Sequence, residues 1–341
     1  MPEFRKDPVT GRWVIIATER AKRPSAFVSS HEAPRDEEFC PFCPGHESHT
    51  PPELLAYREP DSERDQAGWW LRVVPNKYPA LLNTEPVKRS AFGMYDRING
   101  MGVHEVIIET PDHFGHIGEM GLNQVEEIVW AYRDRSIAMR KDPRLEYVMI
   151  FKNHLREAGA SLDHPHSQVI AMPIIPKRVQ EELDGAQRYF DYKDRCVFCD
   201  IIQQEYKDQD RVLYETPRFI ATLPYASRFP FETWVLPKEH TCFFHDIQKQ
   251  EVRELAQVLR HTMGLLKRSL GNPPYNWMLH TTPLQESANP YYHWHMEIIP
   301  KLTRQAGFEW GTGFYINPYA PEKARQFLEQ AGQEAGHKEV V

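Results

Sequence analysis

Hydrophobic and polar residues follow one another along this chain in an order that occurs twice. In the first half, an apolar run at 106–108 leads to Pro111 and His113, and another at 147–151 leads into a polar stretch. Both runs are typical of buried strands. Between them, apolar residues recur with helical spacing over 123–140, which predicts an amphipathic helix.

The second half repeats this order. An apolar run at 234–236 leads to Pro237 and His240, a helical pattern covers 248–270, and a strand is predicted at 275–279, before a polar loop. Each copy then ends on a strand with two histidines two positions apart. These two segments are His164-Pro165-His166-Ser167-Gln168 and His293-Trp294-His295.

The repeat predicts an α+β fold with two tandem halves, each an antiparallel sheet with flanking helices. We place the halves at 1–172 and 173–341, with the join near 173–182, where prolines and charges interrupt the pattern. The two halves can share one continuous sheet.

Composition narrows the class of protein. The chain has 341 residues, and 41% of them are hydrophobic, which is enough for a sizeable core. Its net charge of −7 argues against nucleic acid as a partner. No run is long enough for a membrane span, and the start has no apolar leader, so we expect a cytoplasmic protein. The basic residues Arg20, Lys22 and Arg23 either form a solvated loop or bind an anionic small molecule.

Four of the five cysteines form two C-x-x-C pairs, which in a chain without a secretion signal indicate metal before disulfide. The repeat places two histidines of each half in matching positions, which predicts two closed, structural zinc sites. The alternatives are buried apolar cysteines or a disulfide in each pair. The two predicted ligand sets are Cys40, Cys43, His113 and His164, and Cys196, Cys199, His240 and His293.

A nucleophile is predicted beside the first zinc site. Alternation along a strand puts His164 and His166 on one face, so a metal on His164 would fix His166 next to it. Neutral imidazole attacks phosphorus near pH 7, and Ser161, Ser167 and Gln168 are near enough in sequence to hold the phosphoryl oxygens. Taken alone, a His-x-His pair is more often structural or metal-binding.

These residues together resemble the galactose-1-phosphate uridylyltransferases of the histidine-triad superfamily, over nearly the whole chain. The resemblance implies that His166 is the uridylylated nucleophile and that Gln168 stabilises the intermediate. It also implies that Asn153, Gly159 and Ser161 contact the nucleotide phosphates, and that the first Cys/His set holds zinc.

The resemblance extends to both ends of the chain. It implies that Arg20 and Arg23 bind the nucleotide and that Asn76 lies near the nucleoside, although Lys77 stands where the family often has an acidic residue. The segment 307–318 is more similar to a branch that includes ADP-glucose phosphorylases. The family's sugar-binding segment reaches the neighbouring subunit, which implies a homodimer with sugar contacts from Thr312, Gly313, Phe314 and Asn317.

Some family members hold iron in the second half through one Glu and three His. In this chain His280, His293 and His295 match those histidines, with Glu181 or Glu182 as the carboxylate. The second cysteine pair favours zinc there instead, and leaves His295 outside the ligand set.

The resemblance predicts a ping-pong transferase that moves UMP from UDP-glucose to galactose 1-phosphate through His166. One alternative is the same chemistry with ADP-glucose and phosphate. Another is a zinc-stabilised nucleotide-binding protein without turnover. A third, a histidine-triad hydrolase, is disfavoured because Gln168 stands in place of a third histidine.

Overall fold

The computed structural model describes residues 1–20 and 39–338. Within them, ten strands form one continuous antiparallel sheet, and its centre is the pairing of β13 with β8. The two halves therefore share a sheet, as the repeat allows. In spatial order the strands are β10 (Val212–Glu215), β11 (Phe219–Thr222), β12 (Thr233–Pro237), β14 (His295–Pro300), β13 (Tyr275–His280), β8 (Tyr147–His154), β9 (His166–Met172), β7 (Val103–Ile108), β4 (Trp69–Pro75) and β3 (Leu55–Arg58).

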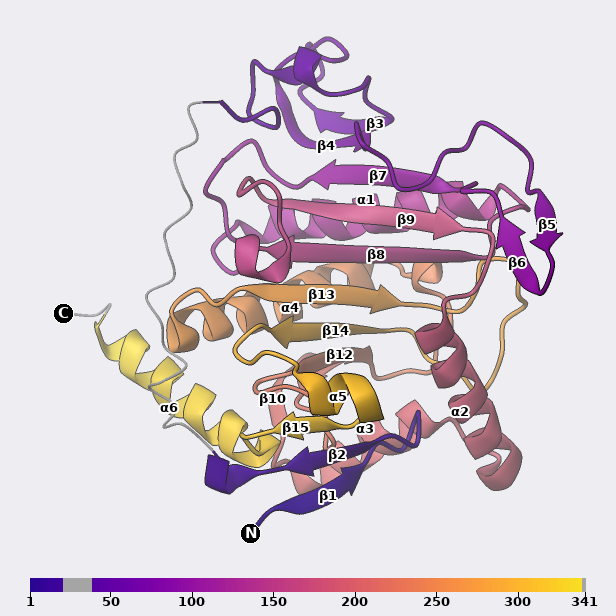
Figure 1. Cartoon of the computed structure of the whole chain (residues 1–341). Helices are drawn as coiled ribbons and strands as arrows, with labels where there is room; N and C mark the ends of the chain where they lie inside the picture. The colour runs from indigo at the N-terminus through magenta and orange to yellow at the C-terminus, as the bar shows by residue number, and fades with distance from the viewer. Residues whose placement is uncertain (21–38, 339–341) are drawn as a thin grey trace.

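Two long helices cover one face of this sheet along both halves. They are α1 (Leu122–Arg140) and α4 (Lys249–Leu270), which lie behind the strands in Figure 1 and pack against each other. Helix α4 begins with a capping box between Gln248 and Glu251 and ends at Gly271 in the left-handed conformation, φ 72°. The C-terminal helix α6 (Pro321–Lys338) packs on α4.

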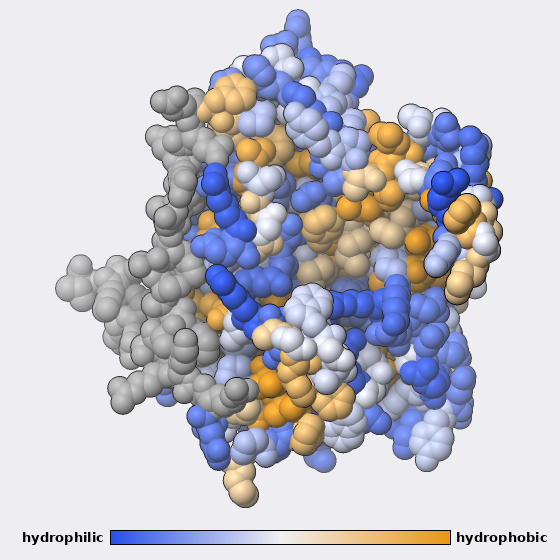
Figure 2. Space-filling model, viewed as in Figure 1, coloured by the Kyte–Doolittle hydropathy of each residue, from blue (hydrophilic) through white to orange (hydrophobic). Residues whose placement is uncertain are grey.

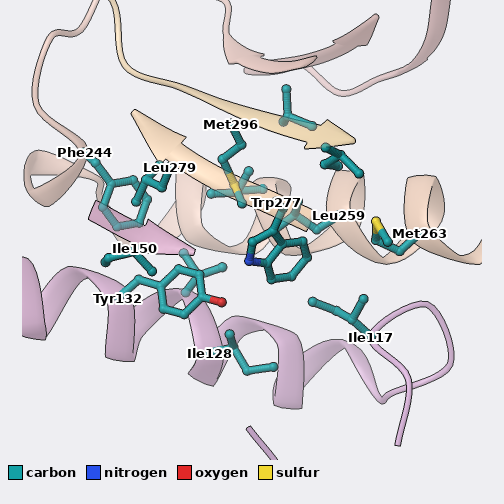
Figure 3. Close-up of a cluster of buried hydrophobic side chains, with 14 of the residues drawn as sticks. Ile117, Ile128, Tyr132, Ile150, Phe244, Leu259, Met263, Trp277, Leu279 and Met296 are labelled. Carbon is teal, nitrogen blue, oxygen red and sulfur yellow. The ribbon is translucent and has the colours of Figure 1, made fainter. Parts of the chain in front are cut away.

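The main core fills the space between the sheet and these helices. Trp277 and Leu279 of β13 meet Tyr132 of α1 and Leu259 of α4 in Figure 3, and all four side chains are buried. Burial of this apolar surface is the main force that holds the two helices on the sheet. Among the described helices, none carries the long apolar stretch that crossing a bilayer requires.

The opposite face of the sheet differs between the halves. In the second half it is covered by α2 (Lys177–Lys193) and α3 (Val197–Asp208), and by a small sheet in which β2 pairs with both β1 and β15. In Figure 1 the small sheet and the short helix α5 lie in front of this half. The small sheet consists of β1 (Glu3–Lys6), β2 (Trp13–Ile16) and β15 (Tyr315–Asn317), and α5 spans Gly307–Thr312.

In the first half the same face of β8 and β9 carries half-buried side chains such as Phe151 and Ile170. Figure 2 shows hydrophobic residues gathered in the middle of this face. A separate hairpin, β5 (Arg89–Phe92) with β6 (Tyr95–Ile98), extends from the edge of the half. Among the described residues, less of the chain therefore covers the outer face of the central strands in the first half than in the second.

The predicted repeat is confirmed element by element in β7, α1, β8 and β9, and again in β12, α4, β13 and β14. The segment 173–182 differs from the expected irregular join, because α2 begins inside it at Lys177. Pro176 immediately precedes that helix, where a missing N–H costs no helical hydrogen bond.

Candidate active site and metal centres

The first Cys/His set comes together at one end of β7 and β9. The ligand atoms of Cys40, Cys43, His113 and His164 lie within 4.8 Å of one another. The Cys43 Sγ is 3.3 Å from His113 Nδ1 and 3.5 Å from His164 Nδ1. A tetrahedral zinc site has sulfur–nitrogen separations of about 3.5 Å, given its metal–ligand bond lengths.

The surroundings of this set also suit a metal. The Nε2 of His164 lies 2.8 Å from the backbone oxygen of Thr110, a contact that orients the ring and leaves Nδ1 for the metal. Burial and the neighbouring Cys40 raise the pKa of the Cys43 thiol to about 11. Two thiolates here therefore need a bound cation to balance them.

The second set repeats this arrangement. The ligand atoms of Cys196, Cys199, His240 and His293 lie within 4.8 Å of one another. The Cys199 Sγ is 3.5 Å from His240 Nδ1 and 3.7 Å from His293 Nδ1, and His293 Nε2 is 2.8 Å from the oxygen of Pro237. The structure thus brings both predicted ligand sets together, with donor atoms of the kind that zinc prefers.

A third cluster lies on β13, β14 and α2 and consists of Glu182, His280, His295 and Glu297. His280 Nδ1 is 3.0 Å from Glu182, and His280 Nε2, which has no hydrogen-bond partner among the described residues, is 3.7 Å from Glu297. Two imidazoles and two carboxylates are a donor set for divalent transition metals, so these residues fit an iron or zinc ion.

Two of the residues that the sequence offered as iron ligands lie outside this cluster. His293 belongs to the second Cys/His set, and Glu181 faces Arg12 at 3.2 Å instead. The fourth donor is Glu297, which the sequence did not single out. Its carboxylate also accepts a hydrogen bond of 2.6 Å from Arg228, so a metal here would share that carboxylate with a cation.

His166 begins β9 and is 5% exposed. Its Nδ1 lies 2.8 Å from the backbone oxygen of His164. Because a carbonyl only accepts, Nδ1 carries the hydrogen and Nε2 keeps its lone pair. Burial lowers the pKa of His166, which favours this neutral form. The ring packs edge-on against Phe42 of the first C-x-x-C pair.

Gln168 is oriented by a histidine that sequence reasoning missed. His104 Nδ1 accepts a hydrogen bond of 3.0 Å from the Ala80 N–H, so its Nε2 carries the hydrogen and donates to Gln168 Oε1 at 2.8 Å. This leaves the Gln168 amide N–H groups for a substrate oxygen. Asn76 lies beside the same ring, with its side-chain amide 3.1 Å from Nε2. The alternation of β7 was the available signal, because it turns His104 away from the core.

The phosphate-contacting residues implied by the resemblance lie around the loop that follows β8. Asn153 Nδ2 is 3.5 Å from the oxygen of Gly159, and Asn153 Oδ1 accepts a 2.7 Å hydrogen bond from Asn276 of the second half. Gly159 has φ 93°, a conformation that other residues rarely adopt. Ser161 lies further along the same loop and is exposed.

A buried polar network that the sequence did not reveal lies behind His166. Lys152 Nζ is 2.5 Å from Glu109 Oε2 and donates to the His166 backbone oxygen at 3.3 Å. Glu109 also accepts a hydrogen bond from Ser167, whose hydroxyl is 2.5 Å from the Tyr132 hydroxyl. These side chains are at most 3% exposed, so the network fixes the backbone of the strand that carries His166.

The remaining predicted residues fall elsewhere. Arg23 lies outside the described residues, as does the side chain of Arg20. Thr312, Gly313 and Phe314 lie at the end of α5, and Phe314 contacts Phe4. Asn317 is fully buried, and its amide donates to Ser227 and accepts from the Tyr319 N–H. Its role is therefore structural, and we remove it from the sugar-binding set.

Comparison with known proteins identifies the family to which this chain belongs. A family model described as galactose-1-phosphate uridyl transferase, N-terminal domain, matches residues 1–176, and a domain of unknown function matches residues 119–339. The open His-Pro-His site on this fold defines a class of enzymes that transfer nucleotidyl groups. Within that class, the chain belongs to the galactose-1-phosphate uridylyltransferase family.

Two curated relatives span nearly the whole chain. ADP-glucose phosphorylase of Arabidopsis thaliana is 39% identical, over 96% of this chain and 93% of its own length. Galactose-1-phosphate uridylyltransferase of Thermotoga maritima is 31% identical, over 97% and 98%. A solved structure of the Arabidopsis ADP-glucose phosphorylase with bound ADP-glucose is similar to this one, with a TM-score of 0.80 and 36% sequence identity. The match covers 96% of this chain and 98% of the solved chain.

Proposed function

We propose that this protein transfers a nucleoside monophosphate between a sugar nucleotide and a phosphate-bearing acceptor, through a covalent bond to His166. The observation that carries the proposal is the hydrogen bond from His166 Nδ1 to the His164 carbonyl. It leaves Nε2 with a free lone pair, beside a Gln168 amide that His104 holds in place.

In the first step, Nε2 of His166 attacks the α-phosphorus of the sugar nucleotide. A nitrogen–phosphorus bond forms, the bond from the α-phosphorus to the bridging oxygen breaks, and the sugar 1-phosphate leaves with that electron pair. The Gln168 amide donates to a non-bridging oxygen as charge builds there. In the second step, an acceptor phosphate oxygen attacks the same phosphorus, and the bond to His166 breaks.

We propose ADP-glucose as the sugar nucleotide and inorganic phosphate as the acceptor, which gives glucose 1-phosphate and ADP. The support is the 39% identity to the Arabidopsis ADP-glucose phosphorylase over 96% of the chain, together with Lys77 in place of an acidic residue. The second candidate is UMP exchange between UDP-glucose and galactose 1-phosphate. The similarity to the Thermotoga uridylyltransferase supports it.

We propose zinc in both Cys/His sets, because each offers two thiols and two imidazoles at tetrahedral spacing. Four protein ligands close these sites to substrate, so the first would hold His164, and through it His166, without touching the reacting phosphorus. The cluster of Glu182, His280, His295 and Glu297 is the place where iron would bind. No step of the proposed reaction requires a metal there.

The proposal extends to a homodimer. The segment Thr312, Gly313 and Phe314 would contact the sugar in the neighbouring subunit's site, and Arg20 and Arg23 would bind the nucleotide phosphates. A cytoplasmic location remains our expectation.

Partial-reaction exchange tests the function. The protein is incubated with ADP-glucose and labelled glucose 1-phosphate, without phosphate acceptor. A ping-pong enzyme moves label into ADP-glucose, because the covalent intermediate forms reversibly. The same exchange measured with UDP-glucose shows whether the enzyme prefers adenine or uracil as the base of the sugar nucleotide. Label transfer that requires added phosphate would contradict the covalent route, and exchange with UDP-glucose alone would replace the first candidate with the second.

A further inference from the structure

A large cavity lies on the outer face of the second half, away from His166. Its volume is about 890 Å³, which is within the range of small-molecule sites. The turn between β1 and β2 forms one wall, α2 and α3 form another, and the ends of β12 and β14 form the floor. None of the residues that line it has a part in the proposed transfer reaction.

Strand register shows that the cavity occupies the repeat's second copy of the active-site position. In the first half Phe151 pairs with Gln168, and in the second half Met278 pairs with Glu297. His295 therefore corresponds to His166, and its Nδ1 is likewise close to the oxygen of the first histidine of its pair, at 3.1 Å.

The cover over each histidine is also repeated. Phe42 of the first C-x-x-C pair packs on His166, and Phe198 of the second pair packs on His295. Both Phe198 and His295 line the cavity. The second half thus keeps a cavity in front of the histidine that corresponds to the proposed nucleophile.

The inner part of this cavity offers acceptors for hydroxyl groups. Glu205 is 3% exposed; its Oε1 is held by Arg211, whereas its Oε2 has no hydrogen-bond partner among the described residues. Leaving a buried carboxylate oxygen unpaired is costly, so a donor from a bound molecule would complete it. Glu232 and Glu297 lie on the floor, where both pair with Arg228, so two carboxylates share one cation and a phosphate is disfavoured there.

The rim of the cavity has the opposite character. Lys6, Arg178 and Lys207 line it and are exposed. Within residues 1–20 and 39–338, none of the three has a carboxylate within 4.0 Å, in contrast to Arg195, which pairs with Asp200. Arg178 also donates to the Tyr315 hydroxyl at 3.3 Å, which does not balance its charge, so these cations can receive an anionic group at the entrance.

We propose that this cavity is a second, non-catalytic binding site for a sugar phosphate. The sugar hydroxyls lie inward and donate to Glu205, and the phosphate remains at the rim with Lys6 and Arg178. Glu297 stands where the first half has Gln168, so no amide is available there to stabilise a phosphoryl group, and the site binds without turnover. The inference depends on the repeat and the cavity, not on the proposed reaction.

Equilibrium dialysis of the full chain with labelled glucose 1-phosphate tests this. We expect two molecules bound per chain, one at each half. Arg178→Glu should weaken one of them by about tenfold or more, because a charge-assisted contact becomes repulsive. Ala226→Leu, which fills the cavity from a different wall, should remove the same one. Both variants should keep the wild-type turnover.

Arg188→Glu is the matched control, since Arg188 is exposed on the same helix but does not line the cavity. It should bind two molecules. One molecule per chain in the wild type, with no effect of Arg178→Glu, would overturn the inference. An Arg178-dependent site for AMP but not for glucose 1-phosphate would overturn it as well. Failure of the exchange reaction would end the proposed function, whereas the Arg178-dependent molecule would still be bound.

Discussion

His166 and His295 occupy the same place in the two halves of the repeat, yet their neighbours differ in kind. Beside His166, Gln168 offers an amide; beside His295, Glu297 offers a carboxylate held by Arg228. Both imidazoles are buried, His166 at 5% and His295 at 1% exposure, and His295 also stacks on His280, with the ring centroids 4.8 Å apart. We therefore propose that the same strand scaffold supports a nucleophile in the first half only.

The difference extends through the sheet. Behind β9 lies the buried pair of Lys152 and Glu109, whereas the residues that pair behind His295 are Leu279 and Met296. Both Cys/His sets are retained, although only the first half has an amide side chain two residues after its second histidine. The geometry of the Cys/His sets is thus shared by the two halves, and we propose that the polar residues around the second histidine determine which half is catalytic.

The largest expected effect is loss of the nucleophile. His166→Ala should lower kcat by at least about 10⁴-fold, because no group replaces the attacking nitrogen. Steady-state phosphorolysis of ADP-glucose measures it. The matched change His295→Asn should leave kcat close to wild type. Equal losses in the two variants would show that the halves do not differ as described.

Exchanging the residue two positions after each histidine is the next test. Gln168→Glu makes the first half resemble the second and should lower kcat by about 10²- to 10³-fold, because a donor to the phosphoryl oxygen becomes a repelling charge. Glu297→Gln should leave exchange of label between glucose 1-phosphate and ADP-glucose unchanged. Normal exchange in Gln168→Glu would rule out the amide's proposed role.

Removing one metal ligand from each half separates stability from chemistry. Cys43→Ser and Cys199→Ser should each lose bound zinc and lower Tm, because metal binding is coupled to folding. At temperatures below the unfolding transitions of both variants, only Cys43→Ser should reduce kcat, by about tenfold or more, since we propose that His164 positions His166. Elemental analysis with activity at low temperature measures both. Equal kcat in the two variants would argue against positioning by the first site.

The smallest effect on turnover is expected from a change in the buried network of Lys152 and Glu109, which lies behind His166. Lys152→Met should reduce the free energy of unfolding by about 3–5 kcal/mol, because Glu109 is left buried and unpaired. Denaturant titration measures this. The double variant Lys152→Met with Glu109→Gln should recover part of the loss. A double variant as unstable as the single one would mean that packing, not the unpaired charge, is the cause.

Much of this organisation could be predicted from sequence. Periodicity located the repeated strands and the two long helices, and residue type with spacing located both Cys/His sets. The role of His166 follows from the resemblance to the family and stays a prediction. Periodicity and motif spacing are read within short segments, or recur in both halves, so they can be recognised without knowledge of tertiary contacts.

The parts that could not be predicted depend on single long-range contacts. Nothing near Lys152 in the sequence points to Glu109, and His104 gains its role only where β7 and β9 pair. Glu297 appeared as one more polar strand residue. The covering of the second half by the β1–β2 hairpin also involves residues from opposite ends of the chain, which no local pattern relates.

The most direct test of the central claim is intact mass spectrometry of the protein after incubation with ADP-glucose alone, followed by peptide mapping. We predict a mass increase of one adenylyl group per chain, located on His166, and absent in His166→Ala. An unmodified protein that still turns over ADP-glucose, or an adduct located on His295, would contradict the account of one covalent centre in the first half.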